Sequence, residues 1–129
     1  MAERVVEVLG VYDADGGVLG ELAYAVNHVL GRAECALCDV THGGVRRRPE
    51  WDAMVASLPV PVRLVHRNEV SEAEGRAVHE SGLPVILGVR DDGTHTVLVP
   101  RQRLAVAHGS VEDVGQALRT ALDDEEGAA

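Results

Sequence analysis

The chain has 129 residues and no Phe, and its 12 Lys and Arg against 21 Asp and Glu give it a formal net charge of −9. This length predicts a single domain, the lack of aromatic residues predicts a core of Val, Leu and Ala, and the negative charge argues against nucleic acid as a partner. No apolar run reaches the roughly 18 residues of a membrane span and no leader pattern opens the chain, so we expect a cytoplasmic protein without a membrane partner.

The first elements follow a strand–turn–helix order. Residues 4–12 form a near-continuous β-branched run, which is typical of a central parallel strand covered on both faces. Residues 13–17 are rich in Asp and Gly and predict a turn. Apolar residues at helical spacing over 18–30 then predict an amphipathic helix that ends at Gly31.

A second helix, strand and helix follow in the middle of the chain. Pro49 suits the first position of a short helix, which should end before Pro59. Residues 60–66 predict the second strand. Ser71, with Glu74 three residues later, has the pattern of a capping box that opens a helix to about residue 80.

The last third predicts an antiparallel hairpin and a helix. Residues 83–89 and 95–99 read as two strands, and the Asp-Asp-Gly turn at 91–93 supplies the positive φ that a tight hairpin needs. Ser110 should cap the final helix. The acidic residues 123–129 predict a flexible, frayed tail.

These elements give the order β-α-β-α-β-β-α, an α/β domain with a mixed sheet whose first two strands are joined by a right-handed crossover. The order resembles the thioredoxin fold, with residues 1–122 as a single domain and a Cys/His helical segment inserted in it. By that resemblance, Pro84 matches the proline that opens the third strand, is typically cis and faces the active site.

Both cysteines lie in one stretch, Cys-Ala-Leu-Cys-Asp-Val-Thr-His at 35–42. If residues 33–42 are helical, Cys35, Cys38 and His42 share one face and the apolar residues lie roughly opposite. The glycine pair that follows would end this helix. The pattern predicts two thiols and an imidazole that face solvent or another surface.

A soft-metal site is the first interpretation of this segment. Thiolate and imidazole ligands suit Zn²⁺ or Cu⁺. His66 is the best fourth ligand, because it ends a parallel strand and ligand sites lie beyond the carboxyl ends of such strands. We therefore expect metal ligation by Cys35, Cys38, His42 and His66. Water or a small-molecule substrate in the fourth position would make the site catalytic, and a closed shell would make it structural.

Two other interpretations stay open. Cys35 and Cys38 could form the dithiol of a metal-free thiol-disulfide oxidoreductase, although Glu34 and Asp39 are expected to raise the thiol pKa values. Alternatively, both cysteines are small buried apolar residues of an interaction module, and His42 caps the helix end.

A family resemblance bears on the turn before the first helix. Residues 12–19, Tyr-Asp-Ala-Asp-Gly-Gly-Val-Leu, resemble the opening Tyr-Asp-Gly-Asp-Cys-Gly-x-Cys of the thioredoxin-like DCC family of thiol-disulfide oxidoreductases. The resemblance implies a thioredoxin-like fold. Gly16 and Leu19 stand where the family has its two cysteines, so the family dithiol is missing from this turn. Asp13 and Asp15 are expected to cap the helix, with acid–base or metal roles as the alternative.

The segment at 35–42 also resembles a Cys-Ala-Leu-Cys-Asp-x-Thr-His motif of a small, uncharacterised bacterial family. That resemblance implies no mechanism.

Overall fold

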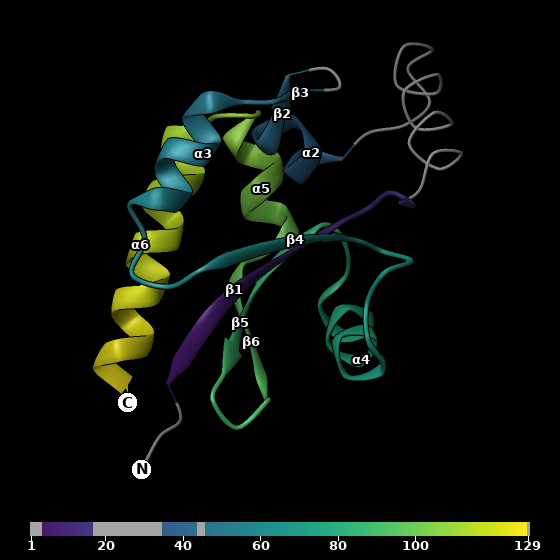
Figure 1. Cartoon of the computed structure of the whole chain (residues 1–129), viewed down its shortest axis with the longest axis vertical. Coiled ribbons are helices and arrows are strands. Elements are labelled where there is room, and N and C mark those ends of the chain that lie inside the picture. Colours follow the sequence, from purple (N-terminus) through teal and green to yellow (C-terminus); the bar gives the residue numbers. More distant parts are fainter. Residues whose placement is uncertain (1–3, 17–34, 44–45, 129) are drawn as a thin grey trace.

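The computed structural model describes residues 4–16, 35–43 and 46–128. Its centre is a four-stranded sheet in the order β4-β1-β5-β6 (Figure 1). Strand β1 is an inner strand that pairs parallel with β4 and antiparallel with β5, and β6 pairs antiparallel with β5. The chain is therefore a mixed α/β protein, and the expectation of an inner first strand is confirmed. The strands are β1 (Val5–Tyr12), β4 (Val62–His66), β5 (Val85–Arg90) and β6 (His95–Val99).

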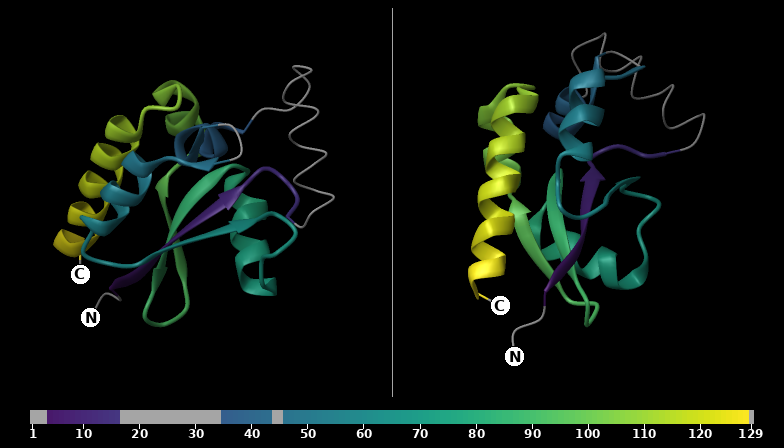
Figure 2. Two further views of the ribbon diagram at one scale, coloured as in Figure 1. Left: turned by 45° about the horizontal axis from the view of Figure 1, so that its top comes forward. Right: turned by 60° about the vertical axis from the view of Figure 1, so that its left-hand side comes forward.

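Helices cover both faces of this sheet. Helices α2, α3, α5 and α6 lie on one face, and α4 lies on the other (Figures 1 and 2). A two-stranded hairpin, β2 with β3, follows α2 directly. The bounds are α2 (Ala36–Thr41), β2 (His42–Gly43), β3 (Arg46–Arg47), α3 (Pro49–Ala56), α4 (Glu72–Ser81), α5 (Arg101–Ala107) and α6 (Val111–Ala128). Within these residues, no helix has the length and apolar character that crossing a membrane requires.

Two apolar clusters form on the two faces because side chains alternate along a strand. Val8 and Tyr12 of β1 join the larger cluster with Trp51 of α3. Leu9 and Val11 of the same strand join the smaller cluster. Strand β1 is therefore shared by both cores.

Gly10 marks a close approach between β1, β4 and α2. A Cβ atom at this position would lie 2.7 Å from Leu64 Cδ2 and 3.3 Å from Leu37 Cδ2. We expect Gly10→Ala to lower the free energy of unfolding by about 1–3 kcal/mol, because both leucines must move in a packed core. Urea denaturation measures this change. Gly127→Ala is the control: a Cβ there has nothing within 4 Å, so equal destabilisation by the two variants would contradict the packing argument.

Several local predictions are confirmed. Ser71 and Glu74 form both hydrogen bonds of the capping box that opens α4, and Gly82 is its C-cap. Ser110 Oγ accepts a hydrogen bond from the Asp113 N–H at 3.2 Å at the start of α6. The Leu83–Pro84 peptide bond is cis. The predicted helix over 18–30 lies outside the described residues.

The C-terminal part of the chain differs from the prediction in two places. Helix α5 was not predicted. Residues 123–128 are not a frayed tail but continue α6 to Ala128. Tertiary contacts explain the second difference, since Glu126 pairs with Arg4 at 2.6 Å and Glu125 accepts a hydrogen bond from Thr96 at 3.1 Å.

Candidate functional site

Cys35 lies at the N-cap of α2 and is only 1% exposed. Its backbone is extended, with φ −146° and ψ 109°, so its side chain does not follow the helical projection of the residues after it. Cys38 and His42 are half-buried. Cys35 belongs to the same apolar cluster as Leu37 and Val40, so the prediction that its side chain lies opposite the apolar face of this segment is wrong.

The two cysteines are close neighbours and are both thiols. Cys35 Sγ accepts a hydrogen bond from the Cys38 backbone N–H at 3.3 Å. The pKa of Cys35 is lowered, first by a hydrogen bond with the Cys38 side chain and then by the backbone N–H groups of Cys38 and Asp13. Burial and the Asp13 carboxylate oppose this shift. The expected rise in pKa is thus wrong for Cys35, because hydrogen-bond donors outweigh the nearby acidic charge.

A buried polar chain runs beside the dithiol. The hydroxyl groups of Tyr12 and Thr41 are 2.9 Å apart, and Thr41 Oγ1 lies 2.6 Å from His42 Nδ1. The Tyr12 ring contacts the rings of both His42 and His66, with centroid separations of 5.9 Å and 5.1 Å. The structure therefore brings two of the predicted site histidines to the same tyrosine. Thr41, which is fully buried, was missed in the sequence.

Burial raises the pKa of Tyr12 from 10.0 to about 12, while the hydrogen bond with Thr41 acts in the opposite direction. Because the folded-state pKa is the higher one, this contribution to stability is complete below pH 10 and is lost as the pH rises toward 12. We expect the protein to be about 1.4 kcal/mol less stable at pH 11 than at pH 9 from this residue alone. Urea denaturation at pH 9 and pH 11 measures the fall in unfolding free energy between the two pH values. This fall should be smaller by about 1.4 kcal/mol in Tyr12→Phe than in the unsubstituted protein. An equal loss in both proteins would contradict the assignment.

His66 ends β4 and is held by a carboxylate. Glu69 Oε1 accepts hydrogen bonds from His66 Nδ1 at 2.7 Å and from the His66 backbone N–H at 2.8 Å. These contacts lower the pKa of Glu69, the backbone hydrogen bond most. Glu69 therefore orients the His66 imidazole. The sequence contains no sign of this role, because Glu69 belongs to no motif and lies three residues after the end of β4.

The loops after β1 and β4 are joined at the same edge of the sheet. Arg67 pairs with Asp15 at 2.8 Å and with Asp13 at 3.2 Å, and the Gly16 N–H donates to Asn68 Oδ1 at 2.6 Å. The helix that the two aspartates were expected to cap lies outside the described residues. Within the described part, the carboxylates of Asp13 and Asp15 pair with Arg67 and so link the ends of two parallel strands.

The four predicted metal ligands divide into two groups. Cys35 and Cys38 contact each other, whereas His42 and His66 pack against Tyr12. Among residues 4–16, 35–43 and 46–128, no three His, Cys, Asp or Glu side chains are arranged to hold a metal ion. Comparisons with models of protein families, with curated proteins and with solved structures find no match.

Proposed function

We propose that the protein performs thiol-disulfide exchange, with Cys35 and Cys38 alternating between a dithiol and a disulfide. The observation that carries this proposal is the Cys35 sulfur at the N-cap of α2, which accepts hydrogen bonds from Cys38 and has a lowered pKa. Cys35 Sγ lies 3.3 Å from the Cys38 backbone nitrogen, which places the two side chains close enough for a disulfide. Thiolate is the reactive form of cysteine, so the lowered pKa of Cys35 favours its attack on a mixed disulfide at Cys38, the step that closes the Cys35–Cys38 disulfide.

The exposures of the two sulfurs suggest an order of events. Cys38, as the more exposed residue, attacks one sulfur of a substrate disulfide as the thiolate. The substrate S–S bond breaks, and the first substrate thiolate leaves. The Cys35 thiolate then attacks Cys38 Sγ and displaces the second substrate thiolate. Two electrons pass from the dithiol to the substrate, and both leaving groups take up protons from water.

The fold is consistent with this proposal. The strand order β4-β1-β5-β6, with β1 parallel to β4 and antiparallel to β5, fits the β-α-β-α-β-β-α order of a thioredoxin-like domain. We therefore propose a thioredoxin-like scaffold, in which this chain places its dithiol on α2. A reducing compartment such as the cytoplasm would keep the pair as thiols between turnovers.

The contact between the two sulfurs also supports a second candidate, which is binding of Zn²⁺ or Cu⁺. Soft thiolates are preferred ligands of both ions. In this candidate Cys35 and Cys38 supply the sulfurs, and His42 or His66 would complete the shell. Exchange is the better supported function, because it needs only the two cysteines, which already contact each other.

One experiment separates the two candidates. Untagged protein is analysed for bound metal and is then equilibrated with glutathione buffers of graded redox potential. Intact-mass analysis at each potential measures the fraction of chains that have lost two hydrogens, which is the fraction with a Cys35–Cys38 disulfide. Metal-free protein with a reversible two-electron transition supports exchange. Stoichiometric Zn or Cu that blocks oxidation supports the metal site, and the absence of both contradicts both candidates.

A further inference from the structure

A groove of about 600 Å³ opens at the start of β1, at the opposite end of this strand from Tyr12. It lies between the start of β1, residues 59–61 and the last turns of α6. Val6 lines it and is 46% exposed, which makes it one of three large apolar side chains that are exposed among the described residues. A groove of this volume is typical of binding sites.

The sequence Pro-Val-Pro at 59–61 limits how far the sheet closes over this groove. Val8 donates a backbone hydrogen bond to the Pro61 carbonyl at 2.9 Å, and the pairing of β1 with β4 starts at this point. Neither proline has an N–H group, so residues 59–61 cannot pair fully with the start of β1. The pairing of β1 with β5 also shifts register next to Val6. Regular sheet pairing is therefore interrupted on both sides of Val6.

The rim of the groove is acidic. Four carboxylates line it beside a single guanidinium, that of Arg4, and they belong to Asp91, Asp123, Glu125 and Glu126. Arg4 and Glu126 pair at 2.6 Å, but their side chains are 66% and 68% exposed, so this ion pair adds little and a partner's cation can compete for Glu126. Within the part of the chain that the structure describes, the Asp123 carboxylate has no ion pair or hydrogen bond.

The end of α6 strengthens this preference for cations. The helix ends at Ala128 and has no basic residue in its last turn. The carbonyl groups at the C-terminal end of a helix carry negative partial charge, which favours cations. The chain as a whole has a formal net charge of −9 and attracts cationic partners. The groove thus combines an apolar wall with a rim of unbalanced negative charge.

We propose that this groove binds a basic segment of a partner protein, in which an apolar side chain lies between Lys or Arg residues. The apolar side chain packs on Val6 and Leu122, and the cationic side chains lie along the acidic rim. An acidic segment is repelled by the rim, and a purely polar segment leaves Val6 in water. This docking role does not depend on the proposed exchange chemistry.

The test measures the binding of short peptides, acetylated and amidated at their ends, to the ¹⁵N-labelled full chain by chemical-shift changes. Lys-Leu-Lys-Leu-Lys is the probe. Lys-Ser-Lys-Ser-Lys keeps the charge without the apolar side chains, and Glu-Leu-Glu-Leu-Glu reverses the charge. We expect the probe to bind at least about ten-fold more tightly than either comparison peptide, since burial of one leucine or removal of like-charge repulsion has at least this effect. The shifts should centre on residues 4–6, 59–61 and 122–126.

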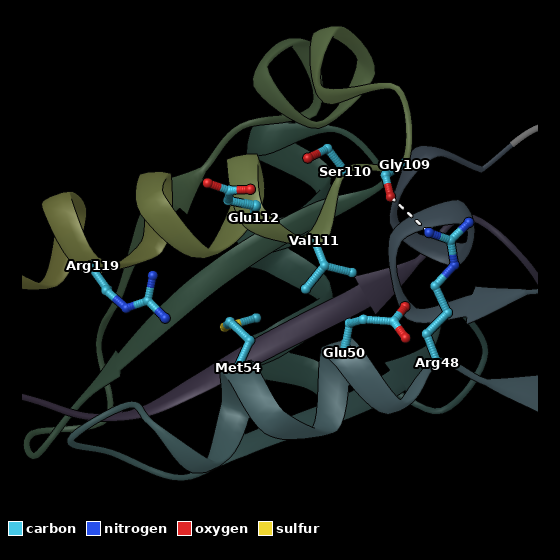
Figure 3. A pocket seen from close by; sticks show the side chains of 8 residues that line it. All are labelled: Arg48, Glu50, Met54, Gly109, Ser110, Val111, Glu112 and Arg119. Atoms are coloured by element: carbon cyan, nitrogen blue, oxygen red, sulfur yellow. Dashed lines mark hydrogen bonds between the residues drawn. The ribbon is translucent and has the colours of Figure 1, made fainter.

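Two variants assign the contacts, and a third is the matched control. Asp123→Asn and Val6→Ser should each weaken binding of the probe about three- to ten-fold. Glu112→Gln removes a carboxylate near the other end of α6, at the pocket between α3 and α6 (Figure 3). About 16 Å of helix, or about two Debye lengths at physiological ionic strength, separates Glu112 from Asp123, so this variant should bind the probe unchanged. Thermal unfolding checks that each variant folds.

Several results would overturn the proposal. These are equal binding of the probe and either comparison peptide, shifts centred elsewhere in the chain, equal losses in Asp123→Asn and Glu112→Gln, and no binding at millimolar peptide. Displacement of the probe by equimolar spermidine would show that the groove selects charge alone. The same shifts on concentrating the chain without peptide would identify a second copy of the chain as the occupant.

Discussion

Replacement of Cys35 by alanine is expected to stop the exchange cycle after its first step. With oxidised glutathione as the substrate, Cys38 would still attack its S–S bond, release one reduced glutathione and keep the other in a mixed disulfide, but no second thiolate would remain to displace that bound glutathione. The mixed disulfide should therefore accumulate to nearly one per chain in Cys35→Ala and stay scarce in the unsubstituted protein. Intact-mass analysis after alkylation measures this fraction.

Cys38→Ala should behave differently. The remaining cysteine, Cys35, is 1% exposed and loses the side-chain hydrogen bond that contributes most to its lowered pKa. We expect slow glutathionylation and a higher thiol pKa in a titration of alkylation rate against pH. His79→Ala on α4 is the control and should keep the full cycle. If the mixed disulfide at Cys38 loses its bound glutathione as fast in Cys35→Ala as in the unsubstituted protein, Cys35 is not the resolving cysteine.

Trp51→Ala is expected to have the largest effect on stability. Trp51 is 2% exposed and is the largest fully buried side chain among the described residues. It anchors the short helix α3 to the larger core cluster. Its truncation should lower the free energy of unfolding by about 3–5 kcal/mol, which is a large part of the total for a domain of this size.

Far-ultraviolet circular dichroism in urea is the suitable measurement, because the variant lacks the only tryptophan of the chain. Trp51→Phe should lose less, since it keeps an aromatic ring in the same place. Val106→Ala is the control, because Val106 is 61% exposed. A loss of below 1 kcal/mol in Trp51→Ala would show that α3 contributes little to the core.

The sequence predicted elements whose signals are local. The capping box of Ser71 and Glu74 involves residues three positions apart, and the hairpin turn at 91–93 depends on Gly93, which has φ +86°. Helix α5 gave a weak signal because only Leu104 and Ala107 are buried in it. Elements with short-range determinants were therefore predicted well, and a short helix with two core contacts was not.

The site was harder to predict than the fold. A helical projection placed Cys35 opposite the apolar residues of its segment, but the N-cap backbone turns Cys35 into the core. The contact between Tyr12 and Thr41 joins residues 29 positions apart. Hydrophobic periodicity relates only residues a few positions apart, so it could not predict this contact. Both differences arise because backbone direction at a helix end and packing between distant segments decide where a side chain lies.

The ion pair between Arg4 and Glu126 has a practical consequence for attaching reporters. It joins the start of β1 to the last turns of α6 at a separation of 2.6 Å. Tyr12, beside the thiols, is at the other end of the same eight-residue strand, about 23 Å away. A fluorophore or affinity handle near either Arg4 or Glu126 would thus sit far from the sulfur chemistry, and two such labels would lie close enough to each other for their energy transfer to report unfolding.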